Sequence, residues 1–336
     1  MKILVTGLGG FLGGALGHRL LAEGHQLRTL SRRPLPEWES LGVEVQRGAL
    51  EDRNSVLLAC QGVEQVYHVA AKAGVWGTFA EYWNSNVEGT RNVLEACHSH
   101  GVTRLIHTSS PSSTFDGKDC LGADESKPYP EQFLNYYSET KAAAEKLVKA
   151  ANGHNGLATV SLRPHLIWGP GDPHILPRVV KMADLGRLRR VGPGDNLVDI
   201  TYVDNAVEAH LCAARDLSLT SPQAGKAYFI SNGSPVRLWE WVDQVLRGLG
   251  RPAVQAHIST AKARLAGGFL EWLYRTLRLP GEPPMTRFVA CQMGTSHYYD
   301  ISASERDFGY RPVVGFEEAM ERTLRHFSEV LPARPR

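Results

Sequence analysis

The chain has 336 residues, of which 43% are hydrophobic, and its 37 lysines and arginines nearly balance its 35 aspartates and glutamates. This composition supports a large buried core, and the formal charge of +2 gives no strong field that would attract nucleic acid. Five cysteines without a CxxC pair favour neither a disulfide framework nor a zinc site, so we expect no bound metal and a reducing, cytoplasmic location.

Short apolar runs alternate with helical patterns in the first half of the chain, which is typical of βαβ units and a parallel sheet. We predict strands over Lys2–Thr6, Gln26–Leu30, Val43–Arg47, Gln65–Val69, Arg104–Thr108 and Ala158–Arg163. Helical patterns lie near Phe11–Glu23, Ser55–Cys60, Tyr82–His100 and Tyr136–Ala151. The predicted fold class is α/β, a Rossmann-like doubly wound parallel sheet with a smaller C-terminal cap.

A glycine-rich loop follows the first predicted strand directly. It runs Thr6-Gly7-Leu8-Gly9-Gly10-Phe11-Leu12-Gly13 and opens into a helix. The glycines permit a tight turn and a close approach of the backbone to a pyrophosphate, whose charge is met by free N–H groups and the helix dipole. The alternative is that the glycines serve only a tight turn between a strand and a helix. The position of the loop at the start of a βαβ unit favours a dinucleotide site.

The residues at the end of the second predicted strand indicate which nicotinamide cofactor is used. NAD enzymes usually place an acidic residue there to bind the ribose hydroxyls, but this chain has Ser31-Arg32-Arg33. A carboxylate would repel a 2′-phosphate, whereas a guanidinium pairs with it through charge-assisted bonds. We therefore predict NADP(H) as cofactor, with Arg32 at the phosphate, against the alternative of two solvated arginines on a loop.

A candidate catalytic group follows the fifth predicted strand. Tyr137 and Lys141 are four residues apart in a helical stretch, so both side chains lie on one face. A phenol has an ordinary pKa of about 10 and needs a nearby ammonium to exchange a proton near neutrality. We expect Ser110 to hold the substrate oxygen and Asn86 to complete a proton relay through the lysine.

Glycine and proline become frequent after Arg163, which is typical of loops. Strand-like runs return at Val198–Val203 and Ala227–Ser231. We predict a dinucleotide-binding domain over residues 1–165 that is re-entered near 198–232, with a substrate-binding cap over 166–197 and 233–336.

An amphipathic helix is predicted over residues 262–279. Leu265, Phe269, Leu273 and Leu277 fall at helical spacing, with arginines interspersed. Packing into the cap is the first interpretation of this pattern. Lining a pocket for a lipophilic substrate and contact with a membrane surface are the alternatives. No run of apolar residues is long enough to predict a transmembrane segment.

Motifs along nearly the whole chain resemble those of extended short-chain dehydrogenases/reductases. They are Thr6–Gly13 as TGxxGxxG, His68–Ala71, Asn86–Thr90, Thr108–Ser110, Tyr137–Lys141, Leu162–Pro164 with Gly169–Asp172, Tyr202–Asn205 and Phe308–Pro312. Within that superfamily, Phe115–Asp119 and Tyr136–Lys141 resemble the 3β-hydroxysteroid and sterol-4-carboxylate dehydrogenase branch. Two further runs, Arg163–His174 and Gly281–Arg287, resemble bacterial 2-alkyl-3-oxoalkanoate reductases of long-chain olefin biosynthesis.

The resemblance implies an oxidoreductase that uses NADPH to reduce a β-keto acid to a β-hydroxy acid in lipid metabolism, with Tyr137 as proton donor. It implies that Lys141 binds the nicotinamide ribose, and that Leu50, Ala70 and Pro164 line the cofactor site with the glycine loop. It also implies a homodimer through the helices that follow the fourth and fifth strands, and association with other enzymes of the pathway. The expected ligand is a small lipophilic keto or hydroxy acid.

Two positions depart from the pattern of related enzymes. Many relatives carry an aspartate near the adenine where this chain has Ala49, and relatives that act on nucleotide sugars carry an arginine where this chain has Val198. The alternatives are an NAD(P)-dependent 3β-hydroxysteroid or sterol-4-carboxylate dehydrogenase and a nucleotide-sugar epimerase or dehydratase. A sensor that binds NADP without catalysis is a further class, but it would not need the tyrosine–lysine pair.

Overall fold

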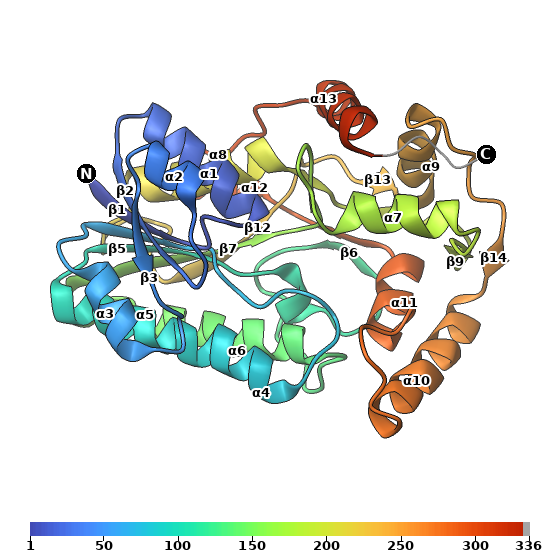
Figure 1. Cartoon of the computed structure of the whole chain (residues 1–336), viewed down its shortest axis with the longest axis horizontal. Helices are drawn as coiled ribbons and strands as arrows, with labels where there is room; N and C mark the ends of the chain where they lie inside the picture. The colour runs from blue at the N-terminus through green and yellow to red at the C-terminus, as the bar shows by residue number, and fades with distance from the viewer. Residues whose placement is uncertain (332–336) are drawn as a thin grey trace.

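A computed structural model describes residues 1–331 of the chain. Its centre is a parallel seven-stranded sheet in the order β12-β7-β5-β4-β1-β2-β3 (Figure 1). The strands are β1 Lys2–Thr6, β2 Gln26–Ser31, β3 Glu44–Arg47, β4 Gln65–His68, β5 Arg104–Thr108, β7 Ala158–Pro164 and β12 Lys226–Ile230. The order of the strands reverses at β1: β2 and β3 lie on one side of it, and β4, β5, β7 and β12 lie on the other. Open α/β sheets bind ligands at such a reversal, at the carboxyl ends of the strands.

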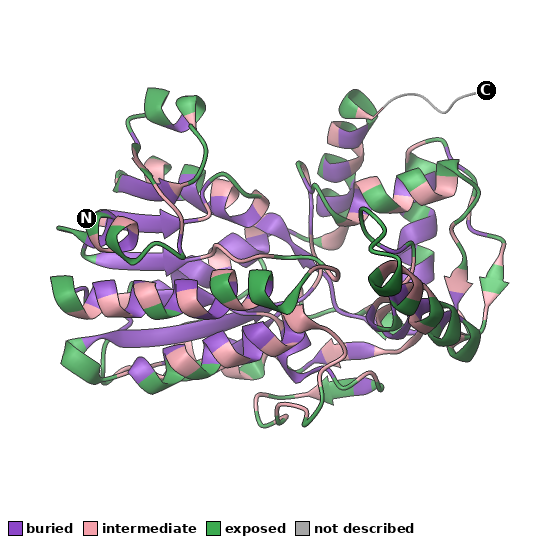
Figure 2. Ribbon diagram, turned by 60° about the horizontal axis from the view of Figure 1, so that its bottom comes forward, coloured by how far each residue is buried: buried purple, intermediate pink, exposed green. Residues whose placement is uncertain are grey.

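Helices cover both faces of this sheet. They are α1 Phe11–Ala22, α2 Pro36–Ser40, α3 Arg53–Cys60, α4 Phe79–Tyr82, α5 Gly89–His100, α6 Tyr136–Ala151, α8 Val203–Arg215 and α12 Ser302–Phe308. Helices α1 and α8 share one apolar core with the sheet, while α3, α5 and α6 pack on the other face. The inner strands are therefore buried on both sides, whereas the edge strand β3 is only partly covered. Helices α1, α3, α5 and α6 keep an exposed outer stripe, while α8 is buried along nearly its whole length (Figure 2).

The second body of the molecule has its own core and lies beside the carboxyl ends of the strands (Figure 1). Its helices are α7 Ile175–Asp184, α9 Leu238–Gly248, α10 Thr260–Thr276, α11 Arg287–Gly294 and α13 Phe316–Val330. A four-stranded sheet joins β13 Val236–Arg237, β10 Leu197–Val198, β15 His297–Tyr299 and β6 Cys120–Ala123. Two strand pairs complete it: β8 Ile167–Trp168 with β11 Thr201–Tyr202, and β9 Arg190–Val191 with β14 His257–Ile258.

Three predicted elements differ from the structure. The single strand expected over 198–203 is wrong, because β10 and β11 join two different small sheets, and only β12 returns to the main sheet. The helix predicted over 82–100 is interrupted by a π-helical segment, Trp83–Glu88. The helix predicted over 262–279 is α10, but its leucine and phenylalanine stripe does not pack into the cap: Leu265 and Phe269 are exposed.

Candidate active site

The glycine loop turns from β1 into α1, and within it the Gly10 N–H donates to the Gly7 carbonyl at 2.9 Å. Gly10 begins α1 without a side-chain cap, and no acidic residue lies in the first turn, so the N-terminal N–H groups are open to an anion. Gly7 has a φ of +80°, and a Cβ there would lie 2.9 Å from the Ala70 backbone. A Cβ on Gly13 would lie 2.1 Å from the Gly7 carbonyl oxygen. The loop therefore needs glycine at both positions, and its shape fits a pyrophosphate.

Replacement of Gly13 by alanine tests this close packing. We expect Gly13→Ala to lower the free energy of unfolding by about 1 to 3 kcal/mol and to weaken dinucleotide binding, because the loop must move away from α1. Gly14→Ala is the matched control, since its Cβ would make only ordinary contacts, with the Leu8 carbonyl at 3.4 Å and the Trp38 ring at 3.8 Å. Chemical denaturation and cofactor titration measure both effects. Equal stability of the two variants would contradict the expectation.

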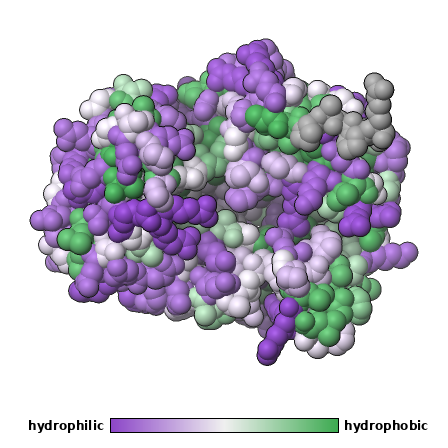
Figure 3. Space-filling model, viewed as in Figure 1, coloured by the Kyte–Doolittle hydropathy of each residue, from purple (hydrophilic) through white to green (hydrophobic). Residues whose placement is uncertain are grey.

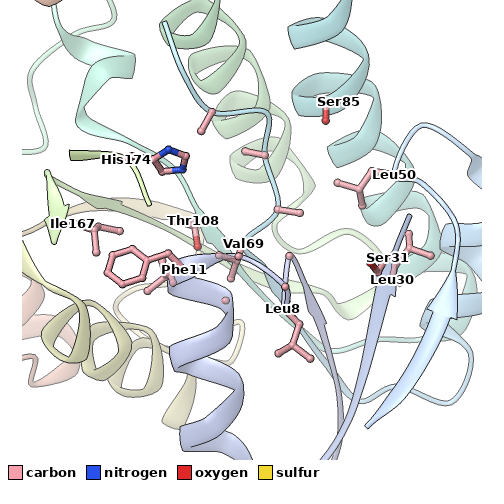
Figure 4. Close-up of a pocket in the computed structure, with 18 of the residues that line it drawn as sticks. Leu8, Phe11, Leu30, Ser31, Leu50, Val69, Ser85, Thr108, Ile167 and His174 are labelled. Atoms are coloured by element: carbon pink, nitrogen blue, oxygen red, sulfur yellow. The ribbon is translucent and has the colours of Figure 1, made fainter. Parts of the chain in front are cut away.

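A cavity of about 770 Å³ extends from the glycine loop along the carboxyl ends of the strands, large enough for a dinucleotide. Figure 4 shows Leu30, Ser31 and Leu50 at one end, with His174 and Ile167 at the other. Of the residues that the sequence assigns to the site, those that line the cavity are Gly7, Gly9, Gly10, Phe11, Leu12, Gly13, Arg32, Leu50, Ala70, Ser110, Tyr137, Lys141 and Pro164. Asn86 is the one residue of the predicted site that does not line the cavity.

Arg32 and Arg33 follow β2 at the rim of the cavity. Both side chains are exposed, and neither forms an ion pair within residues 1–331. The backbone between them is fixed, because the Arg47 guanidinium donates to the Arg32 carbonyl at 2.6 Å and the Ser31 hydroxyl donates to the Arg33 carbonyl at 2.8 Å. Ala49, where relatives carry a carboxylate, also lines the cavity. This end of the cavity therefore offers positive charge from two unpaired guanidinium groups.

Tyr137 and Ser110 meet at the opposite end. Tyr137 lies in the first turn of α6. The preceding residue Asn135 caps this helix, because its side-chain oxygen accepts a hydrogen bond from the Ser138 N–H at 2.8 Å. Ser110 follows β5 and accepts from the Ser112 N–H at 3.2 Å, which fixes its orientation. Burial raises the pKa of Tyr137, and the Ser110 hydroxyl partly opposes that rise. The phenol is thus protonated at neutral pH and suited to donate a proton.

Lys141 lies one turn further along α6 and is buried. Its Nζ donates to the Thr108 carbonyl at 2.5 Å and lies 3.4 Å from Nε2 of His107. Burial lowers the pKa of Lys141 to about 8, with partial opposition from the Glu145 carboxylate. An ammonium with this pKa can change its charge near neutrality, and it lies on the same face of α6 as Tyr137.

A buried ion pair anchors helix α6 to the sheet. The Glu145 carboxylate accepts from Nε of Arg163 at 2.9 Å and from its Nη2 at 2.5 Å, and the Tyr129 hydroxyl donates to it at 2.6 Å. Both members of the pair are at most 4% exposed. Removal of one partner of such a pair leaves an uncompensated buried charge, so the position of α6 relative to β7 is strongly fixed.

Asn86 is buried in a different network. Its amide oxygen accepts from the Lys72 N–H at 2.7 Å, and its amide nitrogen donates to the Thr140 hydroxyl at 3.0 Å. These bonds join the loop around Lys72 to α6. A direct contact with Lys141 is not among them, so the relay expected for Asn86 needs an intervening group. The proton relay through Asn86 therefore remains a prediction.

Sequence reasoning did not assign His174 to the site. Its imidazole lines the cavity beside Ile167 and Phe11 (Figure 4). Asp172 explains this position, because its carboxylate accepts from the N–H groups of His174, Ile175 and Leu176 and so fixes the start of α7. The signal in the sequence was the run Gly169–His174, which predicted a turn but not the direction of the imidazole.

The fold and the site together define an oxidoreductase of the extended short-chain dehydrogenase/reductase type that acts on an alcohol or carbonyl group. Residues 4–259 match the profile of the 3-beta hydroxysteroid dehydrogenase/isomerase family. The chain belongs to this family.

Relatives and solved structures of known identity resemble the chain over nearly its whole length. A 2-alkyl-3-oxoalkanoate reductase of Stenotrophomonas maltophilia is 50% identical over 96% of this chain and 98% of its own length. The Shewanella oneidensis protein of the same name is 47% identical over 95% of this chain and 84% of its own. Among solved structures, MoeE5 in complex with UDP-glucose and NAD is 25% identical, with a TM-score of 0.75 over 99% of this chain and all of its own.

Proposed function

We propose that this chain is an NADPH-dependent reductase that converts a 2-alkyl-3-oxoalkanoate to a 2-alkyl-3-hydroxyalkanoate in long-chain olefin biosynthesis. The observation that carries the proposal is the pairing of Tyr137 with Ser110 in the cavity that begins at the glycine loop. Support for the substrate class comes from the two reductases that are 50% and 47% identical to this chain over 325 aligned residues.

The chain's own groups have separate tasks in this reaction. Ser110 holds the ketone oxygen of the substrate, and Tyr137 donates a proton to that oxygen as negative charge develops on it. Lys141 stabilises the phenolate that remains. The nicotinamide ring, when bound, supplies the hydride. Tyr137 is protonated at neutral pH, as a proton donor must be, because burial raises its pKa above the ordinary value of about 10.

Purified protein tested against a small panel of substrates decides the function. We expect oxidation of NADPH with 2-alkyl-3-oxoalkanoates, measured by absorbance of the reduced nicotinamide. Sterol-4-carboxylates with NAD+ form the second arm, because the alternative is a 3β-hydroxysteroid or sterol-4-carboxylate dehydrogenase, and both the family profile and a sterol-4-alpha-carboxylate 3-dehydrogenase that is 34% identical support it. Turnover of the sterol acids alone would replace the proposed function by this alternative.

Arg32, at the rim of the cavity after β2, supports the choice of NADPH as cofactor. A charge-assisted bond to the 2′-phosphate contributes on the order of 1.5 to 3 kcal/mol, so Arg32→Ala should reduce the NADPH-to-NADH preference by roughly tenfold to 100-fold. The use of NADH should stay nearly unchanged, because its ribose lacks that phosphate. Steady-state kinetics with both cofactors measure the ratio.

Arg33 shares the rim, so the double variant Arg32→Ala/Arg33→Ala is the sharper test. Arg53→Ala is a control, because its guanidinium pairs with Glu95 and the residue does not line the cavity. Equal use of both cofactors by the parent, or an unchanged ratio in the double variant, would show that the arginines form only a solvated loop.

A nucleotide-sugar substrate fits this site less well. Val198 takes the place where an arginine would pair with a diphosphate, and it is buried in β10. The neighbouring Asp199 accepts from the Tyr299 N–H at 2.8 Å. We therefore do not favour the epimerase or dehydratase reaction, although the fold is shared with MoeE5.

The proposed assembly uses a different part of the surface from the cavity. We propose a cytoplasmic homodimer in which α5 and α6, the helices after β4 and β5, pack against their counterparts, and we propose association with other enzymes of the pathway. Within residues 1–331, no helix combines the length and the apolar character that crossing a membrane requires.

A further inference from the structure

Helix α10 is attached to the rest of the protein by one face. Ala263, Gly267 and Glu271 recur every four residues along it and are buried. A Cβ on Gly267 would lie 2.6 Å from the Thr286 backbone, so the helix and the segment before α11 are in close contact. The Glu271 carboxylate accepts from the backbone N–H of Arg287 at 2.7 Å and from its Nε at 2.8 Å. These contacts fix the rotation of α10 about its axis.

The opposite face of α10 is apolar and exposed. Leu265 is 76% exposed, while Phe269 and Trp272 are each 59% exposed. Their spacing of four and three residues aligns them in one stripe. Figure 3 shows a hydrophobic patch at this corner of the molecule, where Figure 1 places α10. A stripe of large apolar side chains that points away from the core is typical of a surface that binds a partner or a membrane.

The charge around this stripe is of one sign. Lys262, Arg264, Arg275 and Arg278 are exposed along α10 and just after it. The only acidic residue between positions 260 and 279 is Glu271, which is 5% exposed and already paired with Arg287. An apolar stripe with aromatic residues and flanking cations is the pattern of a helix that lies in a lipid interface.

The identity of the occupant follows from this charge. A twofold contact with a second copy would place each cationic face against the same face, with no exposed carboxylate on α10 to pair with it. Anionic headgroups complement the cations, and acyl chains cover the stripe. We propose that α10 docks the protein on the surface of a membrane that contains anionic lipid.

The docked orientation would bring the lipid close to the catalytic helix. The Arg275 guanidinium lies 5.2 Å from the ring of Trp76 and 5.6 Å from that of Tyr136, the residue before Tyr137. Tyr274 also meets Trp76, with 6.2 Å between ring centres. If the proposed function holds, a long-chain keto acid reaches the site from the membrane in which it dissolves. The docking itself requires no substrate, so the two proposals are tested separately.

Co-sedimentation with vesicles tests the docking. We expect the full-length protein to bind vesicles of phosphatidylcholine mixed with phosphatidylglycerol and to bind pure phosphatidylcholine far less. Leu265→Gln/Phe269→Gln should lose this binding, whereas the control Leu58→Gln/Leu121→Gln, at residues 57% and 63% exposed elsewhere, should keep it. Lys262→Gln and Arg264→Gln should each weaken binding about fivefold at low salt. Circular dichroism verifies that each variant is folded.

Fluorescence then locates the contact. Brominated lipid should quench part of the tryptophan emission of the parent, and Trp272→Phe should remove that quenching while vesicle binding remains. Two results would overturn the proposal. One is equal vesicle binding by the parent and Leu265→Gln/Phe269→Gln. The other is the absence of vesicle binding together with an oligomer or a protein complex that this variant dissociates, which would assign the face to a protein.

Discussion

Tyr137→Phe is expected to lower turnover by roughly 100-fold or more, because the substitution deletes the proton donor and leaves the ring in place. The variant should fold and bind cofactor like the parent, since only one hydroxyl is lost and the Tyr82 ring still packs at 6.4 Å from the Tyr137 ring. Single-turnover and steady-state kinetics with a β-keto acid measure the rate, and cofactor titration measures the binding.

The neighbouring tyrosine provides a matched control for this result. Tyr136 lies one position earlier in α6, where its ring meets Phe79 with 5.4 Å between ring centres. Tyr136→Phe removes an equivalent hydroxyl and should leave turnover within about twofold of the parent. Turnover of Tyr137→Phe within the same range would show that another group donates the proton.

Lys141→Ala should reduce both turnover and cofactor affinity. A methyl group replaces the buried ammonium, so the Thr108 carbonyl loses its donor and the stabilisation that we propose for the phenolate is removed. We expect a fall of about 100-fold in kcat/KM, comparable with the loss of a general acid or base. Lys149→Ala, at an exposed position on the same helix, is the control. A change in stability without a change in rate would assign Lys141 a structural role.

The pH profile gives a second readout for the lysine. Burial lowers the pKa of Lys141 to about 8, so the group is charged below that pH and becomes neutral as the pH rises through it. The value of kcat/KM for reduction, which reports groups of the free enzyme, should therefore decline above about pH 8. Stability changes with pH in the opposite direction to this rate: because folding lowers the pKa of Lys141, the unfolded chain binds this proton more tightly than the folded chain does, so the free energy of unfolding should rise as the pH increases from about 8 toward the ordinary lysine pKa. A flat profile through this range would contradict the assignment.

Much of the nucleotide-binding half followed from the sequence. The ranges predicted for the first and fifth strands and for the helix that contains Tyr137 coincide with β1, β5 and α6. These segments have strong local signals: buried parallel strands are continuous apolar runs, and α6 begins at an asparagine that caps it. The short strands of the cap have no comparable signal. A two-residue strand such as β10 is defined by its partners β13 and β15, which come much later in the chain.

The sequence by itself was enough to locate the residues to which we assign cofactor binding and catalysis. It identified the glycine loop, the tyrosine–lysine pair and the arginines after β2, because each depends on residues that are close together in the chain. The tertiary structure decided how distant groups combine. It joined Asn86 to Thr140 rather than directly to Lys141, and it brought His174 to the cavity. It also decided which face of α10 is outside: the period of a helix shows that a stripe exists, but only the contacts of Gly267 and Glu271 with the segment before α11 fix its direction.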